Sequence, residues 1–117
     1  MRQMHRDKLD ILQGTLDLMV LQILDTMGPM HGYGLARRLE QVSEDALQIN
    51  HGTIYASLLR LIQRGWIAGA WGTSENGRKA KFYSLTRSGR KQLRAEADKW
   101  ERMSAVVGRV LRTAGRG

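Results

Sequence analysis

The chain has 117 residues, 42% of them hydrophobic, which is enough for one modest core and excludes a second full domain. It contains no cysteine, which excludes a disulfide framework and thiolate metal sites. The formal net charge of +8 indicates a polyanionic partner; residues 1–59 carry five basic and seven acidic side chains, whereas residues 60–117 carry fourteen and four. On charge alone, a merely solubilising basic surface is an alternative explanation.

Two amphipathic helices are expected in the first half of the chain. Thr15 is placed as the N-cap of the first helix, with Asp17 in its first turn, and Gly28-Pro29 ends it. The second helix ends in the polar residues 43–45. The apolar faces consist of Leu16, Val20, Ile23, Leu24 and Met27 in the first helix and of Leu35, Leu39 and Val42 in the second.

A third helix is expected from Asn50, a possible cap, to Gly65, which ends it. Its apolar seam consists of Ile54, Leu58, Leu61 and Ile62. We expect its exposed face to hold His51, Thr53, Ser57, Arg60 and Gln63, with Tyr55 near the boundary. This face offers hydrogen-bond donors and acceptors with almost no acid, a composition typical of a helix that reads a DNA groove.

The periodicity changes after the third helix. Residues 66–71 and 79–85 are short and rich in aromatic side chains, and the intervening loop contains Asn76-Gly77, a strong signal for a β-hairpin turn. We expect Trp66 and Trp71 to pack this hairpin against the helical core.

A long last helix is expected after Thr86, which can cap it. Its apolar seam alternates steps of four and three and consists of Leu93, Ala97, Trp100, Ser104, Val107 and Leu111. A seam of this kind needs a partner helix, so we predict a dimer interface here. Trp100 either packs in that interface or forms one wall of a ligand slot.

This order of elements predicts a mainly α (α+β) fold, a winged helix-turn-helix of three helices plus a two-stranded β-hairpin wing, followed by a long C-terminal dimerisation helix. We place the DNA-binding domain at residues 1–86, with residues 1–12 as an N-terminal arm, and the dimerisation helix at residues 87–117. In such a fold the second helix braces the third in the major groove, while the hairpin tip carries cations to flanking phosphates. Arg78, Lys79 and Lys81 lie at or beside that tip.

Several short pieces in a specific order resemble the PadR family of transcriptional regulators. They are Gly14-Thr15-Leu16-Asp17, Gly28-Pro29-Met30-His31-Gly32-Tyr33-Gly34, Gly52-Thr53-Ile54-Tyr55, Arg60-Leu61, Arg78-Lys79-Ala80-Lys81-Phe82-Tyr83, Leu85-Thr86 and Gly89. The family usually has proline after the recognition-helix tyrosine, where this chain has Ala56. The resemblance implies a homodimer held by the C-terminal helix, a palindromic operator, and repression relieved by a small-molecule effector. The single last helix is similar to the short-tailed branch of the family, in which it packs on the partner's N-terminal helix.

The predicted contacts to double-stranded DNA come from the third helix and the hairpin. They are His51, Thr53, Tyr55, Ser57, Arg60, Arg78, Lys79 and Lys81. For four of the helix residues another role is open: capping for Thr53, spacing between helices for Tyr55, and simple solvation for His51 and Arg60.

No catalytic residue, metal ligand or cofactor is predicted. The chain has no cysteine nucleophile and no phosphate-cradling glycine motif, and its three histidines lack the spacing of a zinc site. His31 is expected to be a hydrogen-bonded turn residue. The richest apolar stretch, residues 16–24, is interrupted by Asp17 and Gln22 and is too short to span a bilayer, so we expect a cytoplasmic protein without membrane association. The alternative to DNA binding is a winged-helix module that binds RNA or a protein.

Overall fold

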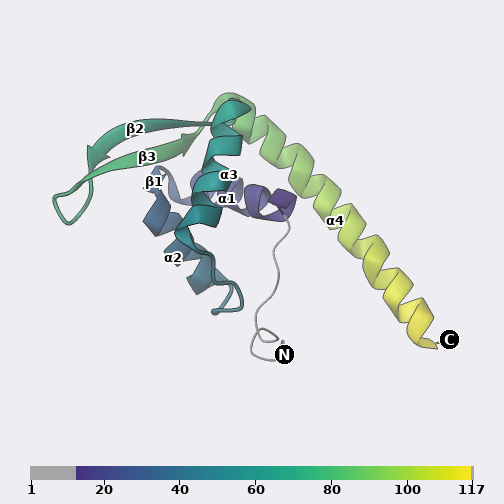
Figure 1. Cartoon of the computed structure of the whole chain (residues 1–117). Helices are drawn as coiled ribbons and strands as arrows, with labels where there is room; N and C mark the ends of the chain where they lie inside the picture. Colours follow the sequence, from purple (N-terminus) through teal and green to yellow (C-terminus); the bar gives the residue numbers. More distant parts are fainter. Residues whose placement is uncertain (1–12, 117) are drawn as a thin grey trace.

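The structure is a computed structural model that describes residues 13–116, and the side chains of residues 14–113. The arm predicted at residues 1–12 lies outside the described residues. The described elements are α1 (Gln13–Met27), β1 (Met30–His31), α2 (Gly32–Val42), α3 (His51–Gln63), β2 (Ile67–Thr73), β3 (Lys79–Leu85) and α4 (Arg87–Arg116). Figure 1 shows α1, α2 and α3 gathered into one body, with the β2–β3 hairpin extending to one side and α4 to the other.

Polar side chains cap three of the helices. The His31 Nδ1 atom accepts a hydrogen bond from the Gly34 amide at 3.0 Å, which confirms its predicted role as a turn residue at the start of α2. Asn50 accepts from the Thr53 amide at 2.8 Å, and Thr86 accepts from the Gly89 amide at 3.0 Å. The prediction for Thr15 was wrong, because α1 already begins at Gln13 and Thr15 lies inside its first turn.

The sheet has three antiparallel strands in the order β1-β3-β2, one strand more than predicted. The hairpin joins β2 to β3 through Asn76-Gly77, as predicted, and Gly77 has a positive φ of 75° that suits a glycine. The additional strand pairs Met30 with Tyr83 and His31 with Phe82. A strand of two residues is too short to produce an alternating pattern, so it could not be predicted from the sequence. It ties the start of α2 to the wing.

One hydrophobic core joins the helices to the sheet. Its fully buried members come from α1, α2 and α3 and include Leu16, Val20, Leu21, Leu35, Ile54, Leu58 and Leu61. Ile67 and Tyr83 add the sheet to this core, and Leu93 adds α4. Trp66 packs against the same cluster, as predicted. All four described helices and the sheet therefore contribute side chains to the body that presents α3.

The first turns of α4 are fixed to this body, and the rest of the helix projects from it (Figure 1). Gly89 lies against the backbone carbonyl of Trp66 so closely that a Cβ atom would collide with it. Arg90 forms an ion pair with Asp25 of α1 at 3.1 Å. Of the helices in residues 13–116, none combines the length and apolar character needed to cross a membrane.

Candidate nucleic-acid interface

A buried carboxylate positions α3 against α1. Asp17 of α1 accepts hydrogen bonds from Ser57 Oγ at 2.6 Å, from Arg60 Nε at 3.0 Å and from Arg60 Nη2 at 2.7 Å. Arg64 adds a longer ion pair at 3.7 Å. The hydrogen bond with Asp17 raises the pKa of the Arg60 guanidinium above its ordinary value, and the charge of Asp17 acts in the same direction while burial opposes both. The network fixes the rotation of α3 about its own axis.

Two of the predicted DNA contacts are therefore corrected. Ser57 is 0% exposed and donates its hydroxyl hydrogen to Asp17, so it lies on the core side of α3 and not on the exposed face. Arg60 is half-buried and directs its guanidinium to the same carboxylate, so it serves the α1–α3 contact instead of facing outward. The sequence pattern alone placed both residues on the exposed face, and the buried acid on another helix turns them toward the core.

The exposed face of α3 lies opposite its core residues. It consists of His51, Gly52, Tyr55, Ala56, Leu59 and Gln63, while Thr53 is half-buried. Ala56 and Leu59 are not among the predicted contacts, because only polar side chains were expected to face the groove. Their position around the helix axis could have indicated them, since both lie on the side opposite Ile54 and Leu61.

The wing places cations beside this face. Arg78 and Lys79 are exposed at the end of the hairpin, and Lys81 is half-buried because its stem lies over Gly69. Trp71 on β2 corrects another prediction: its side chain is 68% exposed and does not pack on the helical core. The reason is its register, because Trp71 pairs with Lys81, beyond the part of the hairpin that the helices cover.

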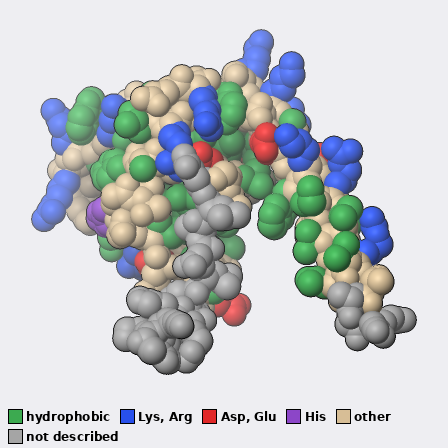
Figure 2. Space-filling model, turned by 45° about the vertical axis from the view of Figure 1, so that its right-hand side comes forward, with side chains coloured by type: hydrophobic (Ala, Val, Ile, Leu, Met, Phe, Trp, Pro, Cys, Tyr) green, Lys and Arg blue, Asp and Glu red, His purple; other side chains and the backbone are tan. Residues whose placement is uncertain are grey.

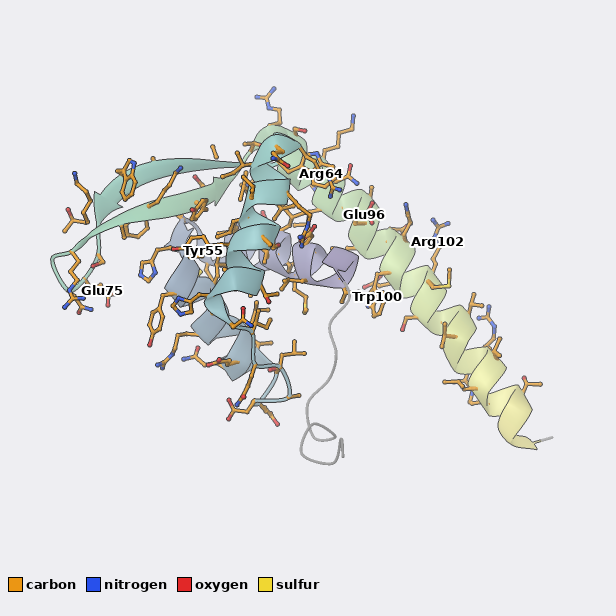
Figure 3. All side chains as sticks on the ribbon, viewed as in Figure 1. Tyr55, Arg64, Glu75, Glu96, Trp100 and Arg102 are labelled. Carbon is orange, nitrogen blue, oxygen red and sulfur yellow. The ribbon has the colours of Figure 1, made fainter. Side chains whose placement is uncertain are left out.

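A cleft of about 680 Å³ separates the wing from the start of α3. Its lining includes Tyr33, Tyr55, Trp71, Arg78, Lys79 and Lys81. Figure 3 shows Tyr55 on the side of α3 that faces the hairpin, and Glu75 at the hairpin tip. Cations and aromatic rings around one cleft suit a polyanion with flat bases or sugars.

Aromatic contacts connect the wing base to α2. The His31 and Phe82 rings meet edge to face with centroids 5.4 Å apart, and Tyr33 lies 6.0 Å from His51 at the start of α3. Burial raises the pKa of the Tyr83 phenol above its ordinary value, and Tyr55 adds to the shift. The wing and α3 are thus held in a fixed relation through β1 and α2.

The predicted dimer residues divide between two surroundings. Leu93 is 4% exposed and belongs to the core of its own protomer, which corrects its assignment to a dimer interface. Ala97 is half-buried, whereas Ser104, Val107 and Leu111 are exposed and Trp100 is 52% exposed. The exposed apolar face also includes three residues outside the predicted seam, Met103, Val106 and Val110. Figure 2 shows these hydrophobic side chains gathered along the projecting part of α4.

Trp100 also borders a hollow between α4 and the start of α1. The hollow measures about 360 Å³ and is lined by Gly14, Thr15, Leu18, Glu96, Lys99, Trp100 and Met103. Figure 3 shows Trp100 directed toward α1, and Arg102 directed to the opposite side of α4.

The three-helix body, the wing and the projecting helix define a winged helix-turn-helix protein with a C-terminal helix. Residues 20–95 match the sequence pattern of the Transcriptional regulator PadR-like family, which is more than half of the chain. The chain belongs to this family, as the resemblance indicated; it is a transcriptional regulator, not an enzyme.

Solved structures agree with this assignment. A PadR-like transcriptional regulator from Bacillus cereus is 30% identical, with 86% of this chain and 94% of that chain covered and a TM-score of 0.74. A PadR family transcriptional regulator from Eggerthella lenta is 29% identical, with coverages of 85% and 83% and a TM-score of 0.70. A transcriptional regulator from Streptococcus is 28% identical, with coverages of 88% and 98% and a TM-score of 0.75.

Proposed function

We propose that the chain acts in the cytoplasm as a homodimeric repressor that binds a palindromic operator. The observation that carries this proposal is that Tyr55 of α3 and the wing cations line one cleft, beside the exposed face of α3. A helix fits the major groove, which is about 12 Å wide, while cations on a hairpin reach the flanking phosphates. Tyr55 and His51 of α3 and Arg78 and Lys79 of the wing are the proposed contacts at this surface, with Thr53 and Lys81 at its edge.

The dimer is supported by the exposed apolar face of α4. Six large apolar side chains lie along it within three turns: Trp100, Met103, Val106, Val107, Val110 and Leu111. A monomer rarely exposes a contiguous apolar patch of this extent, so a partner surface is expected to cover it. We assign that surface to a second copy of the chain, with α4 and the start of α1 as the contributing elements.

Repression relieved by a small molecule is the finer part of the proposal. The hollow beside Trp100 supports it, because an aromatic wall with Leu18 and Met103 suits a flat apolar compound and Glu96 and Lys99 supply polar groups at its edge. A compound bound there would alter the contact between α1 and α4, on which the dimer spacing depends.

Selection of binding sites from random DNA duplexes tests the proposal. We expect a palindromic site whose half-sites are separated by about 34–36 Å, one helical turn, because a two-fold dimer presents two α3 helices. Recovery of an asymmetric single half-site would contradict the dimer. Gel-shift measurements with single-stranded and duplex RNA run in parallel, and binding to RNA or only to a protein partner would overturn the assignment of DNA.

A further inference from the structure

A continuous stripe on α3 points away from the protein and contains no charged residue. It consists of Gly52, Ala56, Leu59 and Gln63, which follow each other in steps of four, three and four and lie directly opposite the buried face of the helix. Leu59 is 56% exposed, so more than half of its side chain is accessible to a partner surface. Three of the four residues present only apolar surface or backbone.

The single Lys or Arg in the sequence of α3, Arg60, does not serve this stripe. Its guanidinium is held by two hydrogen bonds to Asp17, at 3.0 Å and 2.7 Å. Arginine and lysine most often recognise guanine, through its O6 and N7 atoms. The centre of α3 is therefore poorly equipped to read G·C pairs and well equipped for another feature of the groove.

We propose that Ala56 and Leu59 determine the sequence preference of this protein by packing against the C5-methyl groups of thymine in each half-site. The proposal rests on the proposed function, because it requires α3 to enter the major groove. The thymine methyl group is the apolar feature of the major-groove floor, and aliphatic side chains recognise it by contact. Gly52 at the near end of the stripe lets the helix approach closely, and the amide of Gln63 at the far end suits adenine.

Duplex DNA is favoured over a protein as the occupant of this stripe because of the charges that flank it. Arg78 and Lys79 on the wing lie exposed on one side of the cleft that begins at Tyr55. An apolar stripe with cations along one side matches methyl groups on the groove floor beside a phosphate backbone. Contact with a protein is an outcome of the test.

The experiment uses the full chain and the duplex recovered by selection from random sequences. Each thymine in turn is replaced by deoxyuridine, which removes the C5-methyl group and keeps the base pairing. We expect a loss of about three- to fivefold in affinity at one or two thymines of each half-site, the effect of exposing roughly one buried methyl group. Deoxyuridine outside the protected region should have no effect.

Two variants connect the loss to the named residues. Each variant should lose sensitivity at the thymine that its residue contacts. At that thymine, deoxyuridine should lower the DNA affinity of L59A or of A56G by less than about 1.5-fold, because the contact is already absent. V42A is the matched control, since Val42 is exposed on α2 away from the stripe, and it should keep the full deoxyuridine effect. Urea denaturation of each variant checks that folding is retained.

The outcomes separate the inference from the function on which it rests. Failure to recover any duplex contradicts the proposed function itself. Recovery of a duplex that tolerates deoxyuridine at every position overturns the methyl contact while DNA binding stands. A deoxyuridine effect that persists unchanged in both L59A and A56G assigns the methyl contact to other residues and also overturns the inference. Loss of binding to a protein, and not to DNA, in L59A identifies the stripe as a protein contact.

Discussion

Asp17 is the residue on which the orientation of α3 depends. Its side chain is 7% exposed, and burial of a carboxylate is costly unless donors surround it. Ser57 Oγ and the Nε and Nη2 atoms of Arg60 supply those donors at 2.6–3.0 Å. Because these bonds hold α3 in one rotation, they also decide which of its residues face outward.

Replacement of Asp17 by asparagine should lower the free energy of unfolding by about 2–3 kcal/mol, since it removes charge-assisted hydrogen bonds and leaves Arg60 without its counter-ion. The cost stays below that of a fully buried pair, because Arg60 is 21% exposed and can turn to water. The control is D25N, whose ion pair with Arg90 is much more exposed and should be worth less than about 1 kcal/mol. Urea denaturation measures both, and equal losses would contradict the role of Asp17.

Tyr55 offers a second test at this scale. Replacement by phenylalanine removes only a hydroxyl group from a side chain that is mostly exposed on the cleft. If the hydroxyl donates to a phosphate, the DNA affinity should fall by about ten- to a hundredfold, while the urea midpoint stays unchanged. An unchanged affinity together with a lower midpoint would make Tyr55 a spacer between helices.

Local capping roles could be predicted from the sequence, but the direction in which the α3 side chains point could not. Asn50, His31 and Thr86 act locally, within three residues of their partners, so their capping roles could be predicted. Ser57 and Arg60 depend on Asp17, about 40 positions earlier in the chain, and no local pattern reveals that contact. The loss of these two candidates and the exposure of Leu59 follow from one tertiary interaction.

At the scale of elements, the wing is more firmly attached than a two-stranded hairpin would be. β1 pairs with β3, so the wing shares backbone hydrogen bonds with the segment that leads into α2. The hairpin itself could be predicted, because Asn76-Gly77 and the change of period mark it. β1 could not, because two extended residues after Pro29 leave no pattern in the sequence.

The wing cations should contribute affinity without sequence preference. Alanine at Arg78, Lys79 and Lys81 removes up to six phosphate contacts per dimer, and each contact changes the slope of log affinity against log salt by roughly 0.9. We expect the slope to flatten by about 2–5 units, the lower value if only some cations engage, and the ratio of specific to random affinity to stay nearly constant.

The control for this triple variant carries alanine at Arg102, Arg109 and Arg112. These substitutions remove the same amount of positive charge, but from the exposed surface of α4, far along the projecting helix. Its salt slope should remain that of the unchanged protein. Identical slopes for both triple variants would contradict the phosphate contacts of the wing, and a fall in the specific-to-random ratio would indicate a wing arginine in the minor groove.

At the scale of the whole molecule, the projection of α4 is the dominant feature. The Cα radius of gyration is 16.4 Å, compared with about 13 Å for a compact domain of this length. The 4-3 seam predicted this helix and its need for a partner. It could not show that Leu93 belongs to the protomer's own core while Val107 and Leu111 do not, because the repeat continues unchanged through all three positions.

A chain that ends after Lys99 keeps Leu93 in the core and removes most of the exposed apolar face of α4. We expect it to fold and to be monomeric, and therefore to lose most of its affinity for a palindromic site while retaining weak half-site binding. Light scattering at micromolar concentration gives the oligomeric state, and circular dichroism checks the fold. A truncated chain that is still dimeric would place the interface elsewhere.

Trp100 distinguishes packing from ligand binding within that interface. If a second copy covers the 52% of the side chain that is exposed in the protomer, replacement by alanine should cost the interface roughly 1.5–2.5 kcal/mol, about half the value for a fully buried aromatic, or about ten- to seventyfold in the dimer dissociation constant. The matched control is R102A, because Arg102 lies two positions further along and points to the opposite side of α4 (Figure 3). Sedimentation equilibrium over a range of concentrations should show a weakened W100A dimer and an unchanged R102A dimer.

The same samples are titrated with a flat aromatic dye, whose fluorescence reports occupation of the hollow beside Thr15 and Leu18. If W100A loses the dye and keeps its dimer affinity, Trp100 is a wall of the ligand site and the interface is formed by Val107, Val110 and Leu111 instead.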